Sequence, residues 1–246
     1  MDRPTAVVVG VGAEQGIGAA ACRRFAAEGH HVLVAGRTQA KIDRVAQTIR
    51  DRGGSAEAVL TDAADEAQVI GLFDRAMSPG PGFAPADLVV FNAGNNRRID
   101  FREVEASAFE ALWRVGCFAG FLVGREAARR LVPLGRGTVI FTGASASLRG
   151  RPGYAQFAAA KAGLRMVAQA MAREFGPQGI HVAHVIIDGG VDGERLRSAV
   201  PDIAKLRGED GLLGVDPIAE TYWQLHRQHP SAWAHEVDLR PYKEPF

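Results

Sequence analysis

The sequence of 246 residues has little cysteine, few tyrosines and almost no net charge. Its two cysteines, Cys22 and Cys117, exclude a disulfide framework and indicate a reducing compartment. Lysine and arginine number 29 against 28 aspartates and glutamates, giving a net charge of +1. This balance argues against nucleic acid or an anionic membrane as the main partner, because both select for basic surfaces. The only tyrosines are Tyr154, Tyr222 and Tyr242.

Long apolar runs and targeting signals are also missing. No stretch reaches the roughly 18 consecutive apolar residues that a membrane span needs, and residues 1–4 lack the layout of a signal peptide. We therefore expect a soluble, cytoplasmic protein without a membrane partner. Hydrophobic residues make up 47% of the chain and charged residues 23%, so we expect a packed core. The length suits a single domain over residues 1–246.

Short runs rich in Val, Ile and Leu alternate with longer amphipathic segments. The short runs predict strands buried on both faces, at 5–11, 31–35, 56–60, 87–91, 137–141 and 181–187. The amphipathic segments predict helices at 16–28, 39–52, 65–77, 105–131 and 154–175, then a helix near 218–227 and a short strand near 236–239. Strict alternation of this kind predicts an α/β fold, a doubly wound and mostly parallel sheet with helices on both faces.

The segment 189–214 departs from this alternation. It is polar, glycine-rich and weakly patterned, and it follows the sixth predicted strand. In an open α/β sheet this position overlooks the ligand crevice at the carboxyl ends of the strands. We predict a mobile substrate lid here, with a plain surface excursion as the alternative.

The first predicted strand runs into a glycine-rich turn, from Gly10 to Gly18, where a helix begins. Glycines allow a sharp turn and let a pyrophosphate approach the free N–H groups of the helix start. The spacing is not the standard G-x-G-x-x-G, because the residue three beyond Gly12 is Gln15. Tight turns that bind no ligand have a similar composition, so the turn alone is a weak signal.

Residues at the ends of other predicted strands strengthen the nucleotide interpretation. The second strand ends at Arg37 without the acid that grips the ribose of NAD, and Arg37 could pair with a 2′-phosphate. Glu14 would repel that phosphate if it pointed there, and this argues the other way. On the evidence of Arg37 we predict NADP, with NAD as the alternative. Asp62 could accept from an adenine amino group or cap the following helix, and Asn92-Ala93-Gly94 leaves room for a nucleoside.

Together with a lysine in a later helix, these motifs resemble the short-chain dehydrogenase/reductase family. Gly12-x-x-x-Gly16-Ile17-Gly18, the Asn92-Ala93-Gly94 turn and the helix carrying Lys161 occur in the family's order and spacing, and the resemblance covers roughly residues 5–190. It implies a Rossmann-type sheet of about seven strands, a nicotinamide cofactor, and a homodimer or homotetramer. With two neighbouring residues added, the predicted nucleotide site is Gly12, Gln15, Gly16, Ile17, Gly18, Arg37, Asp62, Ala63, Asn92, Ala93, Gly94 and Lys161.

The family's usual Asn, Ser and Tyr positions are substituted in this chain. The tyrosine position, four residues before Lys161, holds Phe157. The serine position holds Ala144, with Ser145 one residue off register, and the asparagine position holds Gly116. A phenyl ring cannot supply a proton, and general acid–base help is worth about 10²–10⁴ in rate. Ordinary carbonyl reduction should therefore be slow unless another group donates the proton.

Tyr154 is the obvious substitute donor. It lies seven residues before Lys161, two helical turns and roughly 10 Å of rise, on the same helix face. Enoyl reductases of this superfamily use a tyrosine at this spacing, because reduction of an enoyl thioester places charge on a more distant carbonyl oxygen. The glycine turn does not resemble that branch, and Tyr154 could simply cap the helix. Ser145 is a further candidate, with a turn role as its alternative.

Other polar groups give weaker signals. Arginines that flank predicted strand ends could attract an acidic substrate, or form a solvated surface; they are Arg97, Arg98, Arg149 and Arg151. The Pro-Gly pair expected after the sixth strand is replaced by residues 187–190, Ile-Asp-Gly-Gly. No spacing of His, Cys, Asp and Glu suggests a metal site.

The sequence thus predicts an NAD(P)-dependent oxidoreductase that acts on a small carbonyl or enoyl substrate through an atypical site. Its catalytic residues would be Lys161, which holds the nicotinamide ribose hydroxyls, and Tyr154 or Ser145 as the proton donor. The principal alternative is a cofactor-binding protein that has lost catalysis and acts as a regulator or scaffold. A purely structural oligomer subunit is a weaker third interpretation, because the glycine turn would then be superfluous.

Overall fold

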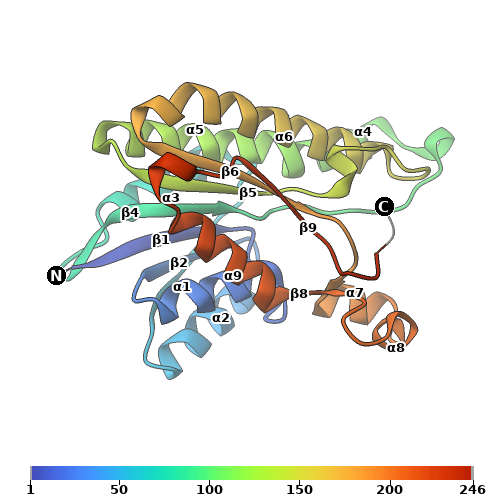
Figure 1. Ribbon diagram of the computed structural model, residues 1–246, viewed down its shortest axis with the longest axis horizontal. Helices are drawn as coiled ribbons and strands as arrows, with labels where there is room; N and C mark the ends of the chain where they lie inside the picture. The colour runs from blue at the N-terminus through green and yellow to red at the C-terminus, as the bar shows by residue number, and fades with distance from the viewer. Residues whose placement is uncertain (1, 245–246) are drawn as a thin grey trace.

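The computed structural model describes residues 2–244, in which a seven-stranded sheet lies between two layers of helices (Figure 1). Every neighbouring pair of strands is parallel, in the order β3-β2-β1-β4-β5-β6-β9. The strands are β1 (Arg3–Val9), β2 (His31–Gly36), β3 (Ser55–Leu60), β4 (Phe83–Phe91), β5 (Gly137–Thr142), β6 (Ile180–Ile187) and β9 (Glu236–Leu239). The predicted Rossmann-type α/β fold with seven strands is confirmed.

The two helix layers are unlike in length (Figure 1). One face of the sheet is covered by α1 (Ile17–Ala27), α2 (Gln39–Asp51) and α9 (Val215–His226). The other is covered by α3 (Glu66–Met77), α4 (Ala106–Trp113), α5 (Ala119–Leu131) and the long α6 (Ala155–Phe175). Because all the strands are parallel, their carboxyl ends lie along one edge of the sheet, where ligands bind in such sheets.

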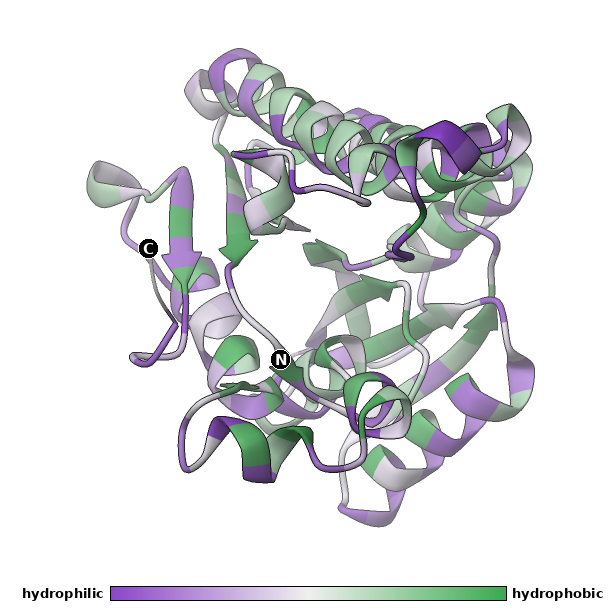
Figure 2. Cartoon of the chain, turned by 90° about the vertical axis from the view of Figure 1, so that its right-hand side faces the viewer, coloured by the Kyte–Doolittle hydropathy of each residue, from purple (hydrophilic) through white to green (hydrophobic). Residues whose placement is uncertain are grey.

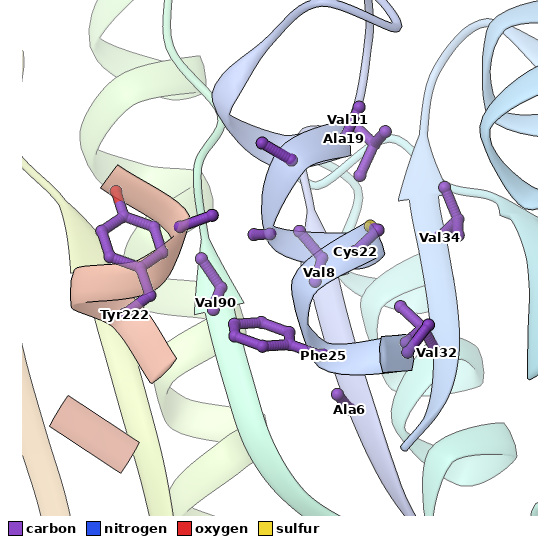
Figure 3. Packing of buried hydrophobic residues seen from close by; sticks show 14 of the residues in the cluster. Ala6, Val8, Val11, Ala19, Cys22, Phe25, Val32, Val34, Val90 and Tyr222 are labelled. Carbon is purple, nitrogen blue, oxygen red and sulfur yellow. The ribbon is translucent and has the colours of Figure 1, made fainter. Parts of the chain in front are cut away.

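The core consists of two apolar clusters, one on each face of the sheet. Successive residues of a strand point to opposite faces, so Ala6 and Val8 of β1 join one cluster and Val7 and Val9 join the other. Figure 3 shows Val8 and Val90 in the first cluster with Phe25 of α1. Apolar colouring accordingly follows the strands in Figure 2. Burial on both faces explains why these strands have unbroken apolar sequences.

The helix expected at 105–131 is divided by a π-helical turn at Arg114–Phe118. A Cβ atom added to Gly116 in this turn would lie 2.9 Å from Ala160 Cβ of α6. Glycine therefore lets the two helix backbones approach closely, and it also weakens regular helix at that point. The periodicity predicted the helix correctly but could not show the extra residue in its turn.

The helical run Ala106–Leu134 is long and apolar enough to cross a membrane, judged by length and composition alone. No uninterrupted apolar run marks this helix in the sequence, so it was not predicted as a candidate membrane span. Leu122 and Leu131 on its inner face are fully buried against the sheet. Phe109, Trp113 and Phe121 are partly exposed on its outer face. This apolar outer face is available for contact with another surface.

Candidate functional site

The glycine-rich turn lies at the carboxyl end of β1. Gly10 has φ of +88°, and a Cβ there would lie 2.4 Å from the Ala93 backbone nitrogen, so no other residue fits. Nothing lies within 4 Å of a Cβ placed on Gly12, so this face of the turn is open. Gly16 precedes α1 without a side-chain cap, which leaves first-turn N–H groups for a ligand. This cradle fits a pyrophosphate.

Asn92 supports the turn from the end of β4. Its Nδ2 donates to the Gly10 carbonyl oxygen over 3.3 Å, and a Cβ on Gly18 would lie 3.1 Å from the same nitrogen. The three residues of the turn Asn92-Ala93-Gly94 thus have different roles. The asparagine side chain braces the glycine turn, and only the two small residues that follow it leave room beside the cradle.

Asp62 and Ala63 follow β3 at the same edge of the sheet. The Asp62 carboxylate accepts from the Ala64 N–H over 3.0 Å, which makes a local turn. The N-cap of α3 is instead Asp65, whose carboxylate accepts from the Gln68 N–H over 3.2 Å. The cap interpretation of Asp62 was therefore wrong, because the helix begins one turn later than Asp62. Asp62 remains half-buried and Ala63 is buried.

The polar groups at the end of β2 bear on the choice between NAD and NADP. Arg37 is exposed directly after β2. Glu14 of the glycine turn, which would repel a nearby phosphate, accepts a hydrogen bond of 2.9 Å from the Thr48 hydroxyl of α2. The only acid in the turn is therefore engaged by a neighbouring helix, while the guanidinium at the end of the strand faces solvent.

Lys161 joins the ends of two central strands. Its side chain is only 5% exposed, and Nζ donates to the Thr142 carbonyl oxygen at the end of β5 over 2.7 Å. A Cβ on Gly94, after β4, would lie 3.2 Å from Nζ. Burial lowers the pKa of Lys161 from 10.5 to about 8. The ammonium thus lies where the spaces beyond β4 and β5 meet.

Thr142 and Tyr222 support this lysine, and neither residue was predicted from the sequence to be near the site. The Thr142 hydroxyl and the Tyr222 hydroxyl are 2.7 Å apart, and both side chains are buried. Tyr222 comes from α9, on the opposite face of the sheet from Lys161. Burial raises the pKa of its phenol. Tyr222 is therefore part of the core.

Replacing Lys161 by methionine is expected to change how stability depends on pH. Between pH 8 and 10.5 the unfolded chain binds a proton at this lysine that the folded chain does not, so the free energy of unfolding rises with pH. Below pH 8 the whole cost of the buried charge, about 3 kcal/mol, opposes folding. Methionine removes that cost. The Tm of Lys161→Met relative to wild type, measured by circular dichroism, should be highest below pH 8 and fall towards pH 10.5; a difference independent of pH contradicts this.

Tyr154 occupies the N-cap of α6, close to its expected place, and its side chain is half-buried. Regular helix from Ala155 onward keeps Lys161 two turns away on the same face. Phe157 lies between them and is also half-buried. The close approach of Gly116 to Ala160 leaves no space for the asparagine side chain that the family usually places there. This chain therefore departs from the family's usual residues at both the tyrosine position, Phe157, and the asparagine position, Gly116.

Ser145 is held by a buried carboxylate. Asp188, directly after β6, is 1% exposed, and its Oδ1 and Oδ2 accept from Arg149 Nη2 over 2.8 and 2.9 Å. The Ser145 hydroxyl also donates to this carboxylate. Arg240 contacts the same carboxylate. Burial by itself would raise the pKa of Asp188, but these hydrogen bonds and charges hold it below its usual value. The charge of Arg149 is therefore paired, and Ser145 has its hydroxyl hydrogen engaged.

The remaining arginines lie around the start of α6. Arg97, Arg98 and Arg151 are exposed. The loops that carry them adjoin, because the Ile99 N–H donates to the Gly153 carbonyl oxygen over 2.9 Å. Three exposed arginines thus lie on the two loops that adjoin the start of α6. Arg149, which the sequence grouped with them, is different because Asp188 pairs with it.

Residues 189–214 bridge the loops after β1 and β4. The segment contains β7 (Val191–Asp192), α7 (Glu194–Ala199), α8 (Ile203–Arg207) and β8 (Leu213–Gly214), and β7 pairs with β8. The Glu194 N–H donates to the Gln15 carbonyl oxygen over 2.9 Å. Arg195 Nη2 lies 2.5 Å from Asn95 Oδ1 and 2.7 Å from the Asn96 carbonyl oxygen. The segment therefore crosses the edge of the sheet at which the glycine turn and Lys161 lie.

Comparisons with known proteins agree with this geometry. A family model described as short chain dehydrogenase matches residues 6–203. YuxG of Bacillus subtilis strain 168, an uncharacterized oxidoreductase, is 34% identical over 188 residues. That match covers 75% of this chain but only 27% of YuxG, so the chain spans about a quarter of that relative.

Two solved structures match over nearly the whole chain. A short-chain dehydrogenase from Rhodopseudomonas palustris is 38% identical with a TM-score of 0.82, covering 97% of this chain and 99% of the other. A gluconate 5-dehydrogenase from Burkholderia cenocepacia, solved in complex with NADP and tartrate, is 25% identical with a TM-score of 0.84. It covers 98% of this chain and 95% of the other.

Proposed function

Since this chain belongs to the short-chain dehydrogenase/reductase family, we propose that it is an oxidoreductase that uses a nicotinamide cofactor, with a preference for NADP(H). The observation that carries the proposal is the buried Lys161 ammonium, held by the Thr142 carbonyl beside Gly94. A buried ammonium with one backbone partner has further N–H donors for ribose hydroxyls. When bound, the nicotinamide supplies or accepts a hydride.

The preference for NADP rests on Arg37. Its exposed guanidinium follows β2, where a 2′-phosphate would be neutralised, and Glu14 is engaged by Thr48. The related structure from Burkholderia cenocepacia was solved with NADP. Together these observations favour the phosphorylated cofactor over NAD.

Exchanging Arg37 for aspartate should reverse this preference. Loss of a hydrogen-bonded charge pair costs about 1.5–3 kcal/mol, so NADPH affinity should fall about 10- to 100-fold while NADH affinity stays level or rises. Fluorescence titration with both nucleotides measures this. Arg44→Asp, the same exchange at an exposed position of α2, serves as the matched control. Equal NADPH affinity in the two variants contradicts the assignment of Arg37.

Tyr154 is the proposed proton donor, because Phe157 cannot act and Ser145 is engaged by Asp188. Hydride delivery builds negative charge on a substrate oxygen, and a phenol at the mouth of α6 could protonate it. The displacement of the phenol by about one helical turn from the family's usual position suits an oxygen farther from the carbon that receives hydride. We therefore propose both enoyl compounds and small carbonyl compounds as substrates.

A substrate that carries a carboxylate or phosphate fits the surroundings of Tyr154. Arg97, Arg98 and Arg151 are exposed on the two adjoining loops, and guanidinium groups bind such anions strongly. The related gluconate 5-dehydrogenase structure contains tartrate, which is also a carboxylate. Residues 189–214 would act as the lid over this substrate, with Arg195 bonded to the loop after β4 when the lid is closed.

We also propose that the protein forms a homodimer or homotetramer. Phe109, Trp113 and Phe121 on the outer face of α4 and α5, and Met166 on α6, are each between 37% and 50% exposed. Several large apolar side chains gathered on one helical face suit a contact between identical subunits.

A cofactor-binding protein without catalysis is the second candidate. It is favoured by the substituted tyrosine, serine and asparagine positions, and by the engagement of Ser145 with Asp188. Such a protein would bind NADPH and turn over no substrate. Assays of NADPH consumption with keto acids, ketones and enoyl thioesters separate the two candidates.

A further inference from the structure

Three potential metal ligands meet at the edge of the sheet opposite the glycine turn. His30 directly precedes β2, Asp87 is the central residue of β4, and His226 ends α9. Each offers one ligand atom, and these atoms all lie within 4.8 Å of one another. Their separation along the chain, 57 residues between His30 and Asp87 alone, explains why sequence spacing gave no metal site.

The distances in this cluster suit a small tetrahedral ion. His30 Nε2 and Asp87 Oδ1 are 3.2 Å apart. Bonds of about 2.0–2.2 Å to a tetrahedral Zn²⁺ place two ligand atoms roughly 3.3–3.5 Å apart. The imidazole rings of His30 and His226 have centroids 5.6 Å apart and planes inclined at 74°. A common ion would therefore require only small side-chain movements.

The surroundings hold the ligands in place. Thr138 Oγ1 lies 3.0 Å from His226 Nδ1, which fixes that imidazole by a partner behind the ligand. His30 is 3% exposed, and its Nδ1 has no hydrogen-bond partner within residues 2–244.

A cavity lies beside the cluster. Asp87 and His226 line a cavity of about 290 Å³, together with Thr138, His181 and Trp233. His181 stacks on Trp233 with centroids 4.9 Å apart. The cavity gives an ion a route of entry and holds space for a water as the fourth ligand.

We propose that His30, Asp87 and His226 form a binding site for a divalent transition-metal ion, with Zn²⁺ as the best fit to two imidazoles and one carboxylate. The ion would join the end of α9 to the start of β2 and the middle of β4 and stabilise the fold from the side remote from the cofactor cradle. This proposal is independent of the proposed reaction, because none of the three residues lies at the carboxyl edge of the sheet.

Calorimetric titration of chelator-treated protein with Zn²⁺ tests the site. We expect one ion per chain, and a Tm about 5–10 °C higher at a free Zn²⁺ concentration of about 100 times Kd. Asp87→Asn and His226→Ala should each abolish this binding. Thr138→Val should keep the stoichiometry and weaken affinity about 10- to 100-fold, because it loosens only the partner of a ligand. His229→Ala, at an exposed histidine three residues beyond His226, is the matched control and should bind as wild type.

The outcomes that overturn the proposal are specific. They are the absence of Zn²⁺ binding to the wild type, or binding retained by both Asp87→Asn and His226→Ala. If either variant fails to fold, Co²⁺ bound to the wild-type protein decides the question. A visible absorption spectrum typical of four-coordinate Co²⁺ supports the site, whereas the spectrum of hydrated Co²⁺ overturns it.

Discussion

Lys161→Met is expected to lower kcat/KM about 10²- to 10³-fold and to weaken NADPH binding. Removal of one preorganised donor at a reacting centre has an effect of this size. The side chain is 5% exposed and its ammonium is held by the Thr142 carbonyl beside Gly94, so neither water nor a neighbouring residue can readily replace it. Steady-state kinetics and NADPH titration measure the two effects.

The lysine variant has a demanding internal control. Because methionine removes a buried charge, the variant should keep or raise its Tm at pH 7 while losing activity. Lys41→Met, the same exchange at an exposed position of α2, should leave kcat unchanged. A Lys161→Met protein that is stable and retains wild-type kcat/KM would show that this lysine does not support the reaction.

Tyr154→Phe is expected to lower kcat about 10²- to 10⁴-fold, the usual contribution of a positioned acid or base. The loss should fall on kcat more than on NADPH affinity, because the proposed role of the phenol is proton transfer and not cofactor binding. Tyr154 is half-buried at the N-cap of α6. Kinetics with the best substrate of the panel, together with a thermal melt, measure this.

Two other variants sharpen the tyrosine experiment. Tyr242→Phe removes the same hydroxyl from a side chain that is 77% exposed, and its kcat should equal that of wild type. Phe157→Tyr adds a phenol four residues before Lys161, where the family usually has one, and should raise reduction of simple ketones. Full activity of Tyr154→Phe would remove Tyr154 from the mechanism.

The strands and most helices could be predicted from the sequence because strands buried on both faces have unbroken apolar runs. The strand at Glu236–Leu239 was predicted with its observed bounds. The π-turn at Arg114–Phe118 was not, since it depends on the contact between Gly116 and α6. Regular periodicity contains no information about such a contact between two helices.

The sequence predicted the candidate site only where a position requires one particular residue type, as the glycine turn does. Gly10 and Gly12 show their purpose through a positive φ and an open face. The sequence did not predict contacts between residues that are far apart in the chain and meet only on folding, such as the contact between Asp188 and Ser145. The loss of the family's Pro-Gly pair after β6 was a visible signal of change at that place, but it did not reveal a buried carboxylate.

Transfer of deuterium from NADPH that carries deuterium at both hydrogen positions of the nicotinamide C4 tests the central claim most directly. The labelled cofactor is incubated with the protein and a panel of keto acids and enoyl thioesters, and the masses of the products are measured by mass spectrometry. We predict a product that carries one deuterium, formed by the wild type and lost in Lys161→Met. NADPH that binds tightly while no product of the panel acquires deuterium would contradict an oxidoreductase and favour a cofactor-binding regulator.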